Sequence, residues 1–217
     1  QIEKGYSKSA VKKLNKLEPI NISIFIDNKE LRVKADNDEI ERVLMKAIAN
    51  ETIDAYYQPI YDDTGRIIAA EALARIKDDS GEVIINDEIL PIAEKSGIII
   101  KIGIRTFENI CRFVRDNDIR KMGIERIGVN LSPLQCMQRN LADNFIDMMS
   151  HYGLDGSYFT FEITDSPNNY SKGTLMHNIN KLIASGADFA MDRFGREYSN
   201  LMNITEMPVD IVKIDRT

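Results

Sequence analysis

The sequence predicts an α/β fold with a mainly parallel sheet, and the number of units favours a β/α barrel over an open sheet. From residue 126 onward, short apolar runs alternate with longer amphipathic runs, which is typical of parallel strands with helices outside. Ahead of them, two apolar runs flank Asp62-Asp63-Thr64-Gly65, which is typical of a hairpin turn. The units are fewer than the eight of a complete barrel, so we expect the last ones to be missing.

Composition indicates an ordinary globular protein. Of the 217 residues, 43% are hydrophobic and 29% charged, with a net charge of −6, which argues against general nucleic-acid binding. No apolar run approaches the ~20 residues of a membrane span, so we expect no membrane contact by this segment. Gln1 begins the chain without a signal-peptide pattern. We therefore expect a cytoplasmic piece of a longer protein, which an upstream segment could anchor to a membrane.

Cysteines and histidines are too few for a zinc site. Cys111 and Cys136 lack CxxC spacing, and His151 and His177 are the only histidines. We interpret the cysteines as reduced small hydrophobes and the histidines as surface or helix-cap residues.

Residues 1–35 differ from the rest and are interpreted as a linker or the tail of an upstream domain. A lysine-dotted stretch predicts a short helix, and alternating isoleucines over 20–26 predict a β-hairpin. Residues 36–217 form the main domain. Asp38 and Glu41 resemble a capping box, and apolar spacing over 40–48 predicts a helix that leads into the hairpin.

Two helices follow the hairpin, and the alternating units come next. The first helix starts at Asn86 as its N-cap and ends at Gly97, and the second has an apolar stripe of Ile104, Phe107, Cys111 and Val114. The remaining elements are a strand at 126–132, a helix at 141–152, a strand at 158–164, a helix at 171–185, and strands at 188–192 and 209–215.

One polar side chain interrupts the apolar run of each of these strands. Successive side chains of a strand point to opposite faces, and the C-terminal strand ends form the reaction face of a β/α barrel. Three carboxylates, an amide and a lysine are therefore expected to meet at one mouth: Glu71, Asn130, Glu162, Asp192 and Lys213. Their oxygens suit Mg²⁺ or Mn²⁺. The alternative to a shared site is that each residue alone is a polar group at a strand end that faces solvent. For Glu71, the alternative is an ion pair with Arg75 on a solvated strand.

Several short motifs occur in a fixed order along residues 38–217. They are Tyr57-Gln-Pro-Ile60, Glu71-Ala-Leu-Ala-Arg75, Leu90-Pro-Ile-Ala-Glu94 with Gly97, Val129-Asn-Leu-Ser132, Phe161-Glu-Ile-Thr-Asp165, Asp192-Arg-Phe-Gly195 with Tyr198-Ser199, and Val209-Asp-Ile-Val-Lys-Ile-Asp215. With them the chain resembles the EAL-domain cyclic di-GMP phosphodiesterases. The resemblance implies a modified TIM barrel with an antiparallel opening strand that hydrolyses cyclic di-GMP with two Mg²⁺ or Mn²⁺ ions.

The resemblance also implies roles and partners. Lys213 matches the lysine that orients the attacking water, and with Glu71 it is the expected catalytic pair. Arg75 matches a phosphate contact, and Gln58 and Leu73 match substrate-lining positions. The implied partners are cyclic di-GMP, an upstream sensor or diguanylate-cyclase-like domain, and a second copy in a homodimer. The positions that match metal ligands are Glu71, Asn130, Glu162 and Asp192.

The chain departs from the family pattern after Asp192. The family has a second Asp there that holds the second metal, and this chain has Arg193. A unit charge pair at ~4 Å is worth ~4 kcal/mol at an effective dielectric of ~20, and twice that against a dication. We therefore expect one ion at most and severely impaired hydrolysis. Glu197 stands where the family has a small residue, so we expect that loop to take another shape.

The sequence leaves two questions open. Arg193 is expected to substitute for the missing metal by pairing with Asp192, Glu162 or Glu71, or else to be an exposed loop residue beside a usable one-metal site. Three functions are open. The chain is a degenerate module that binds cyclic dinucleotides or partners, or a working phosphodiesterase that produces linear pGpG, or an unrelated Mg²⁺-dependent β/α-barrel enzyme. Arg193 favours the first.

Overall fold

The computed structural model describes residues 37–77, 89–164, 172–195 and 207–215. The predicted N-terminal hairpin, the Asn86 cap and Glu197 lie outside these ranges. Within the described ranges, six strands form one mixed sheet in the order β1-β2-β3-β4-β5-β6, with β1 antiparallel to β2 and the other neighbours parallel. An α/β fold with an antiparallel opening pair is thereby confirmed, and a closed barrel stays a prediction.

The strands and helices follow the expected order, with ends that differ by a few residues. The strands are β1 (Ile53–Tyr61), β2 (Ile67–Ile76), β3 (Arg126–Leu131), β4 (Phe159–Thr164), β5 (Asp188–Phe194) and β6 (Ile211–Ile214). The helices are α2 (Asn37–Ala49), α3 (Ile89–Lys95), α4 (Ile98–Asn117), α5 (Pro133–Cys136), α6 (Leu141–His151) and α7 (Lys172–Ala184), with 3-10 turns η1 (Ile119–Met122) and η2 (Gly156–Tyr158). None of these helices is both long and apolar enough to cross a membrane.

The β1–β2 hairpin is closed by Asp62. Its carboxylate accepts hydrogen bonds from the backbone N–H groups of Thr64 and Arg66, both at 2.9 Å, and Gly65 takes a positive φ of 79° that suits glycine. The predicted alternation is confirmed in β2, because Ala70 and Ala72 are buried in the core.

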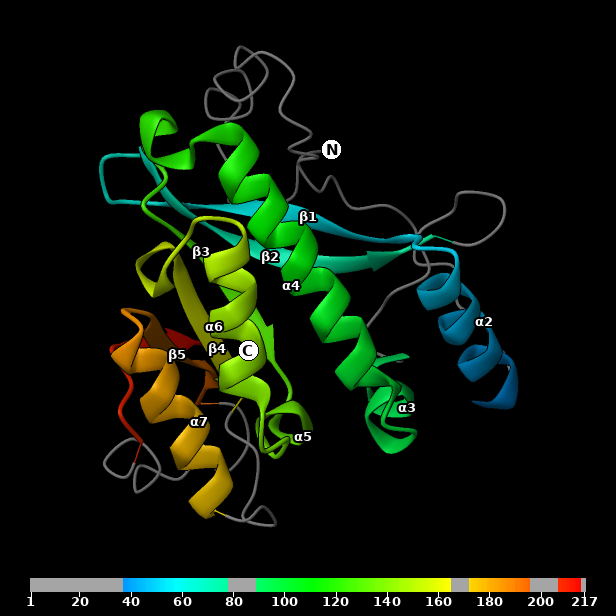
Figure 1. Ribbon diagram of the computed structural model, residues 1–217. Coiled ribbons are helices and arrows are strands. Elements are labelled where there is room, and N and C mark those ends of the chain that lie inside the picture. The colour runs from blue at the N-terminus through cyan, green and yellow to red at the C-terminus, as the bar shows by residue number, and fades with distance from the viewer. Residues whose placement is uncertain (1–36, 78–88, 165–171, 196–206, 216–217) are drawn as a thin grey trace.

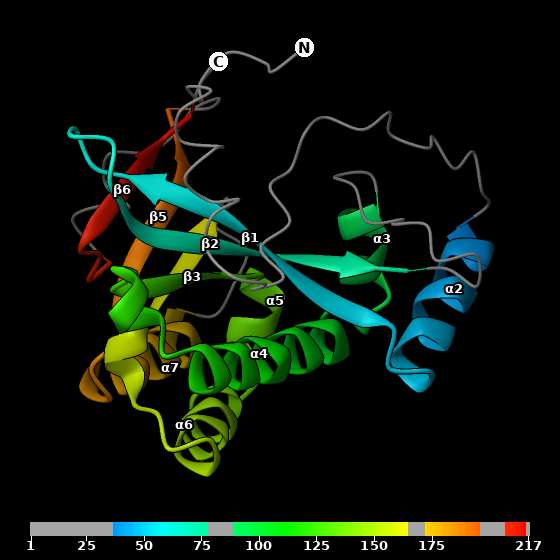
Figure 2. The same cartoon turned by 90° about the horizontal axis from the view of Figure 1, so that it is seen from above.

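The core has two parts. The larger lies between the sheet and the helices on one of its faces (Figures 1 and 2), where Phe107 of α4 stacks on Phe145 of α6 with ring centroids 4.2 Å apart, and Phe159 of β4 meets Phe107 edge-on. The smaller joins α2, α3 and the start of α4 to the far end of the hairpin; it includes Leu44 and Ile76. Full burial of each such side chain contributes about 1.5–3 kcal/mol.

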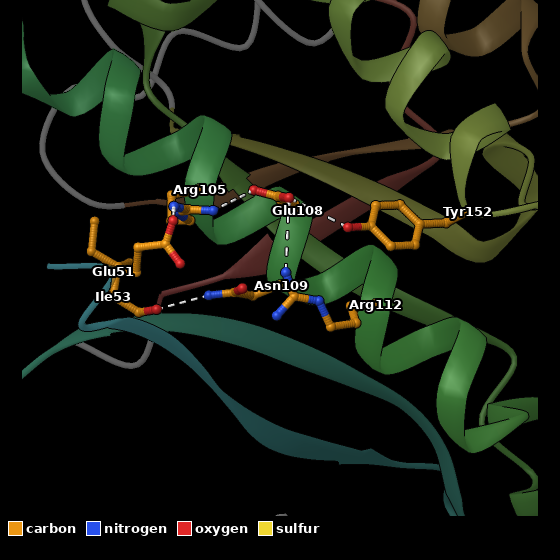
Figure 3. A network of polar contacts seen from close by, with 7 residues as sticks. All are labelled: Glu51, Ile53, Arg105, Glu108, Asn109, Arg112 and Tyr152. Carbon is orange, nitrogen blue, oxygen red and sulfur yellow. Dashed lines mark hydrogen bonds and ion pairs between the residues drawn. The ribbon is translucent and has the colours of Figure 1, made fainter. Parts of the chain in front are cut away.

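Helix α4 is also tied to its neighbours by polar contacts (Figure 3). Asn109 Nδ2 donates to the carbonyl oxygen of Ile53 at 2.7 Å, which fixes α4 to the start of β1. Glu108 accepts from Arg105 at 2.8 Å and from the Tyr152 hydroxyl at 3.4 Å, and Arg105 also pairs with Glu51. Together these contacts connect α4 to the hairpin on one side and to the end of α6 on the other.

Two details differ from the sequence prediction. Ile104 is 37% exposed, whereas Phe107, Cys111 and Val114 are buried as expected. The reason is that Ile104 lies at the edge of the apolar stripe, where it and Phe145 line a surface groove between α4 and α6. The short helix α5 was not predicted, because its four residues are too few for a helical period.

The interpretation of the cysteines and histidines holds. Cys111 and Cys136 are free thiols that are fully buried, and burial raises the pKa of each to about 12, so both stay protonated and unreactive near neutral pH. His151 and His177 are exposed.

Candidate functional site

The sheet curves so strongly that its second and sixth strands meet through their side chains. In sheet order, β3, β4 and β5 separate β2 from β6, which would place the two strands ~19 Å apart in a flat sheet. Nevertheless, Lys213 Nζ of β6 lies 2.6 Å from Glu71 Oε2 of β2. The concave face thus encloses a polar cluster, which we call the acidic cluster: Glu71, Glu162, Asp192 and the lysine among them, Lys213.

Lys213 is the cation at the centre of the acidic cluster. Its ammonium donates to Glu71 and to Glu162, and lies 3.8 Å from Asp192 Oδ1. Burial by itself would lower the pKa of Lys213, but the carboxylates of Glu162 and Glu71 outweigh it and raise the pKa. Lys213 is therefore charged at neutral pH, and it compensates carboxylates that would otherwise repel one another.

Glu162 is the most deeply buried member, with 3% of its side chain exposed. Burial raises its pKa to about 7, and the nearby Glu71 carboxylate adds to the rise, whereas Lys213 opposes it. A carboxyl in the interior prefers to be neutral unless a cation meets it. Glu162 therefore exchanges its proton close to neutral pH.

This shift predicts a pH dependence of stability that belongs to Glu162. Since its folded-state pKa of about 7 lies above the ordinary value of 4.5, the folded protein holds the proton longer than the unfolded chain does. The stabilisation is complete below about pH 4.5 and is lost as the pH rises through 7, by about 3 kcal/mol in total. Glu162→Gln should remove this slope.

The measurement is urea unfolding of both proteins at a series of pH values. The free energy of unfolding of the wild type minus that of Glu162→Gln should fall as the pH rises. A difference that is flat, or that rises with pH, would show that Lys213 fully offsets the burial of Glu162.

Gly128, which was not among the predicted site residues, makes room for Glu162. Glu71 pairs in register with Gly128 on β3, and a Cβ at Gly128 would lie 2.3 Å from Glu162 Oε1. Any larger residue would press the carboxylate away from its position. A glycine within an apolar strand run is the signal that could have found this close approach.

Asn130 and Arg193 lie at the edges of the acidic cluster. Asn130 is exposed, and its Nδ2 donates to Glu71 Oε1 at 2.8 Å. Arg193 has a positive φ of 56° and a 43% exposed side chain, and its Nε lies 3.7 Å from Asp192 Oδ2. The cation that contacts both Glu71 and Glu162 is thus Lys213, whereas Arg193 stands at the rim beside Asp192.

The expected substrate-lining residues lie on the hairpin. Gln58 of β1 pairs in register with Glu71 of β2, and Leu73 and Arg75 follow at alternate positions, so they share the face of Glu71. Arg75 donates to the carbonyl oxygen of Ala74 at 2.8 Å. This row extends from the acidic cluster along the hairpin, and its binding role stays a prediction.

The residue types of the cluster fit a hard divalent ion, but their arrangement holds a lysine. Glu71, Glu162 and Asp192, with the Asn130 amide oxygen, are the donors that Mg²⁺ and Mn²⁺ prefer. Across the described ranges, no three Asp, Glu, His or Cys side chains are already placed to hold an ion. An ion at these residues would therefore have to displace the Lys213 ammonium from at least part of its contacts.

Comparison with known proteins gives consistent matches. The family model described as EAL domain matches residues 41–217. The oxygen sensor protein DosP of Escherichia coli is 31% identical over 80% of this chain, and the cyclic di-GMP phosphodiesterase RocR of Pseudomonas aeruginosa is 28% identical over 80%. The chain spans 22% of DosP and 44% of RocR, so it matches only part of each.

Solved structures show a similar fold. The PaMucR phosphodiesterase in its c-di-GMP complex has a TM-score of 0.73 and 29% identity, with 82% of this chain and 72% of that chain covered. The FimX EAL domain has the same TM-score at 17% identity, with 84% and 73% covered, which supports the fold alone.

Proposed function

The chain belongs to the EAL domain family, and we propose that it is a signalling domain that binds cyclic di-GMP but hydrolyses it poorly. The observation that carries the proposal is the cation arrangement at the acidic cluster. Lys213 lies among the carboxylates, and Arg193 stands beside Asp192. Two positive side chains at this mouth suit a phosphate ligand. Arg193, at the position where the family has a metal-holding Asp, also opposes a second divalent ion.

The residues divide into those that would hold an ion and those that would hold the dinucleotide. Glu71, Asn130, Glu162 and Asp192 would hold one Mg²⁺ or Mn²⁺, which supplies Lewis acidity toward a phosphate oxygen and lowers the pKa of a bound water. When the ion binds, Lys213 would give up hydrogen bonds to the carboxylates. Its ammonium N–H groups would then donate to a water or to a phosphate oxygen and orient it. The hairpin row would line the ligand, with Arg75 contacting a phosphate: Gln58, Leu73 and Arg75.

Three wider proposals concern the barrel, an upstream domain and the assembly of the protein. The curvature that brings Lys213 to Glu71 supports the proposal that the sheet belongs to a modified β/α barrel. We also infer that residues 1–35 connect to an upstream sensor or cyclase-like domain, with the domain acting as a homodimer. Sedimentation of the full protein with and without the dinucleotide would measure that assembly.

A working phosphodiesterase is the second candidate, because Asn130 and Lys213 both contact Glu71 at the mouth. Calorimetry with cyclic di-GMP, with and without Mn²⁺, together with chromatography for linear pGpG, separates the candidates. We expect binding without metal and little product. Rapid turnover would overturn the proposal in favour of the enzyme. Absence of dinucleotide binding under every condition would overturn both and leave contact with a protein partner or an unrelated barrel chemistry.

A further inference from the structure

Glu94 of α3 has no role in the site described above, although it belongs to one of the motifs in the sequence. Its carboxylate Oε1 accepts a hydrogen bond from Ser132 Oγ at 2.6 Å. Ser132 is the N-cap of α5 and follows β3 directly, so the contact joins α3 to the strand end that carries Asn130.

The chemistry of the Ser132 hydroxyl makes this contact directional. A hydroxyl has one proton to donate, and an ionised carboxylate can only accept. Because Ser132 gives its proton to Glu94, a lone pair of Oγ is left to accept from the backbone N–H of Leu134 at 3.2 Å. Glu94 thereby sets the orientation of the hydroxyl that caps α5.

The α5 segment is attached on two further sides. Gln135 is 3% exposed, its Oε1 accepts from the Ser132 N–H at 2.9 Å, and it packs so closely on α4 that a Cβ at Gly103 would lie 1.7 Å from its Nε2. From α7, Asn178 donates to the carbonyl oxygen of Cys136 at 2.8 Å. Glu94 supplies the attachment to α3.

We propose that Glu94 is a positioning residue that holds Asn130 against Glu71 by acting through Ser132. Asn130 lies two residues before Ser132, on the final stretch of β3, and its Nδ2 donates to Glu71 Oε1 at 2.8 Å. When the Glu94 contact is lost, the N-terminal end of α5 loses its attachment to α3 while those through Gln135 and Asn178 remain. It can then shift away from α3 and carry Asn130 with it. Whether this changes ligand affinity rests on the proposed function; the position of Asn130 does not.

The contact between Glu94 and Ser132 also connects helix α2, through α3, to the end of β3. Ala93, next to Glu94, is fully buried in the smaller core together with Leu44 of α2 and Ile102 of α4. Figure 2 shows α2 and α3 side by side at the far end of the hairpin. A continuous set of contacts thus runs from α2 through α3, Glu94 and Ser132 to the strand end that carries Asn130.

The test compares Glu94→Ala, Glu94→Gln, Ser132→Ala and the double variant Glu94→Ala/Ser132→Ala. Glu125→Ala is the control, because Glu125 is exposed at the opposite end of β3. The readouts are the NMR resonances of the Asn130 side-chain amide in the protein without ligand, and the affinity for cyclic di-GMP.

We expect both alanine variants to shift the Asn130 resonances and to weaken dinucleotide binding about three- to tenfold. The double variant should be no weaker than the weaker single variant, because both changes remove one interaction. Glu94→Gln retains an oxygen acceptor and should stay close to wild type, as should Glu125→Ala.

Unmoved Asn130 resonances in both alanine variants, or effects that multiply in the double variant, would overturn the inference. If Glu94→Ala does not fold, Ser132→Ala makes the same test, since it removes the same hydrogen bond. If the wild type binds no dinucleotide, the proposed function fails, while the Asn130 resonances still decide the role of Glu94.

Discussion

Replacing Lys213 by methionine is expected to lower the free energy of unfolding by about 3–5 kcal/mol near neutral pH. Methionine keeps most of the volume of the side chain but removes the charge that Glu71 and Glu162 contact. The carboxylates of Glu71 and Asp192 would then repel one another without compensation, and buried Glu162 would have to take up a proton. Urea unfolding measures the loss.

Two controls isolate the charge. Lys121→Met removes an ion pair with Asp118 whose lysine is 83% exposed, so it should leave the free energy of unfolding nearly unchanged. Adding Glu162→Gln to Lys213→Met should restore much of the loss, because it removes the most buried carboxylate. A Lys213→Met protein as stable as the wild type would show that solvent, not Lys213, compensates the acidic cluster.

Replacing Arg193 by aspartate is expected to raise the affinity for Mn²⁺ at least about a hundredfold, equivalent to ~2.8 kcal/mol. That is well below the ~8 kcal/mol that one unit charge contributes against a dication at ~4 Å and an effective dielectric of ~20. The backbone should tolerate the change, because Arg193 has a φ of 56° and aspartate adopts this region more readily than most residues. Calorimetry with Mn²⁺ measures the affinity, and hydrolysis of cyclic di-GMP should rise with it.

The matched control is Arg139→Asp, which makes the same charge change at an exposed residue of the groove between α4 and α6. It should leave Mn²⁺ affinity and turnover unchanged. If Arg193→Asp binds Mn²⁺ no better than the wild type, charge at this position is not what limits metal binding.

The alternation of apolar and polar residues within each strand predicted much of the fold. It also predicted which face of the sheet each site residue occupies. Period-2 alternation placed Glu71 opposite Ala70 and Ala72, and both alanines are buried in the core. Parallel order placed the polar residues of β3 and β4 as neighbours, and Asn130 does pair in register with Glu162. These predictions succeed because they depend only on backbone geometry.

Features that depend on contacts between distant segments could not be predicted in this way. The sequence placed Lys213 at one mouth with the carboxylates, but the 2.6 Å contact between its Nζ and Glu71 Oε2 depends on the curvature of the whole sheet. The close approach of Gly128 to Glu162 and the bond from Ser132 to Glu94 likewise join separate elements. No local pattern contains such distances.

The proposed loss of hydrolysis depends on how many divalent ions bind beside Asp192. Anomalous scattering from crystals of the wild-type protein soaked with Mn²⁺ and cyclic di-GMP counts them directly. We predict one manganese peak at most, with the dinucleotide bound and Arg193 still next to Asp192. Two manganese peaks ~3.5–4 Å apart, both in contact with the acidic cluster, would contradict the account.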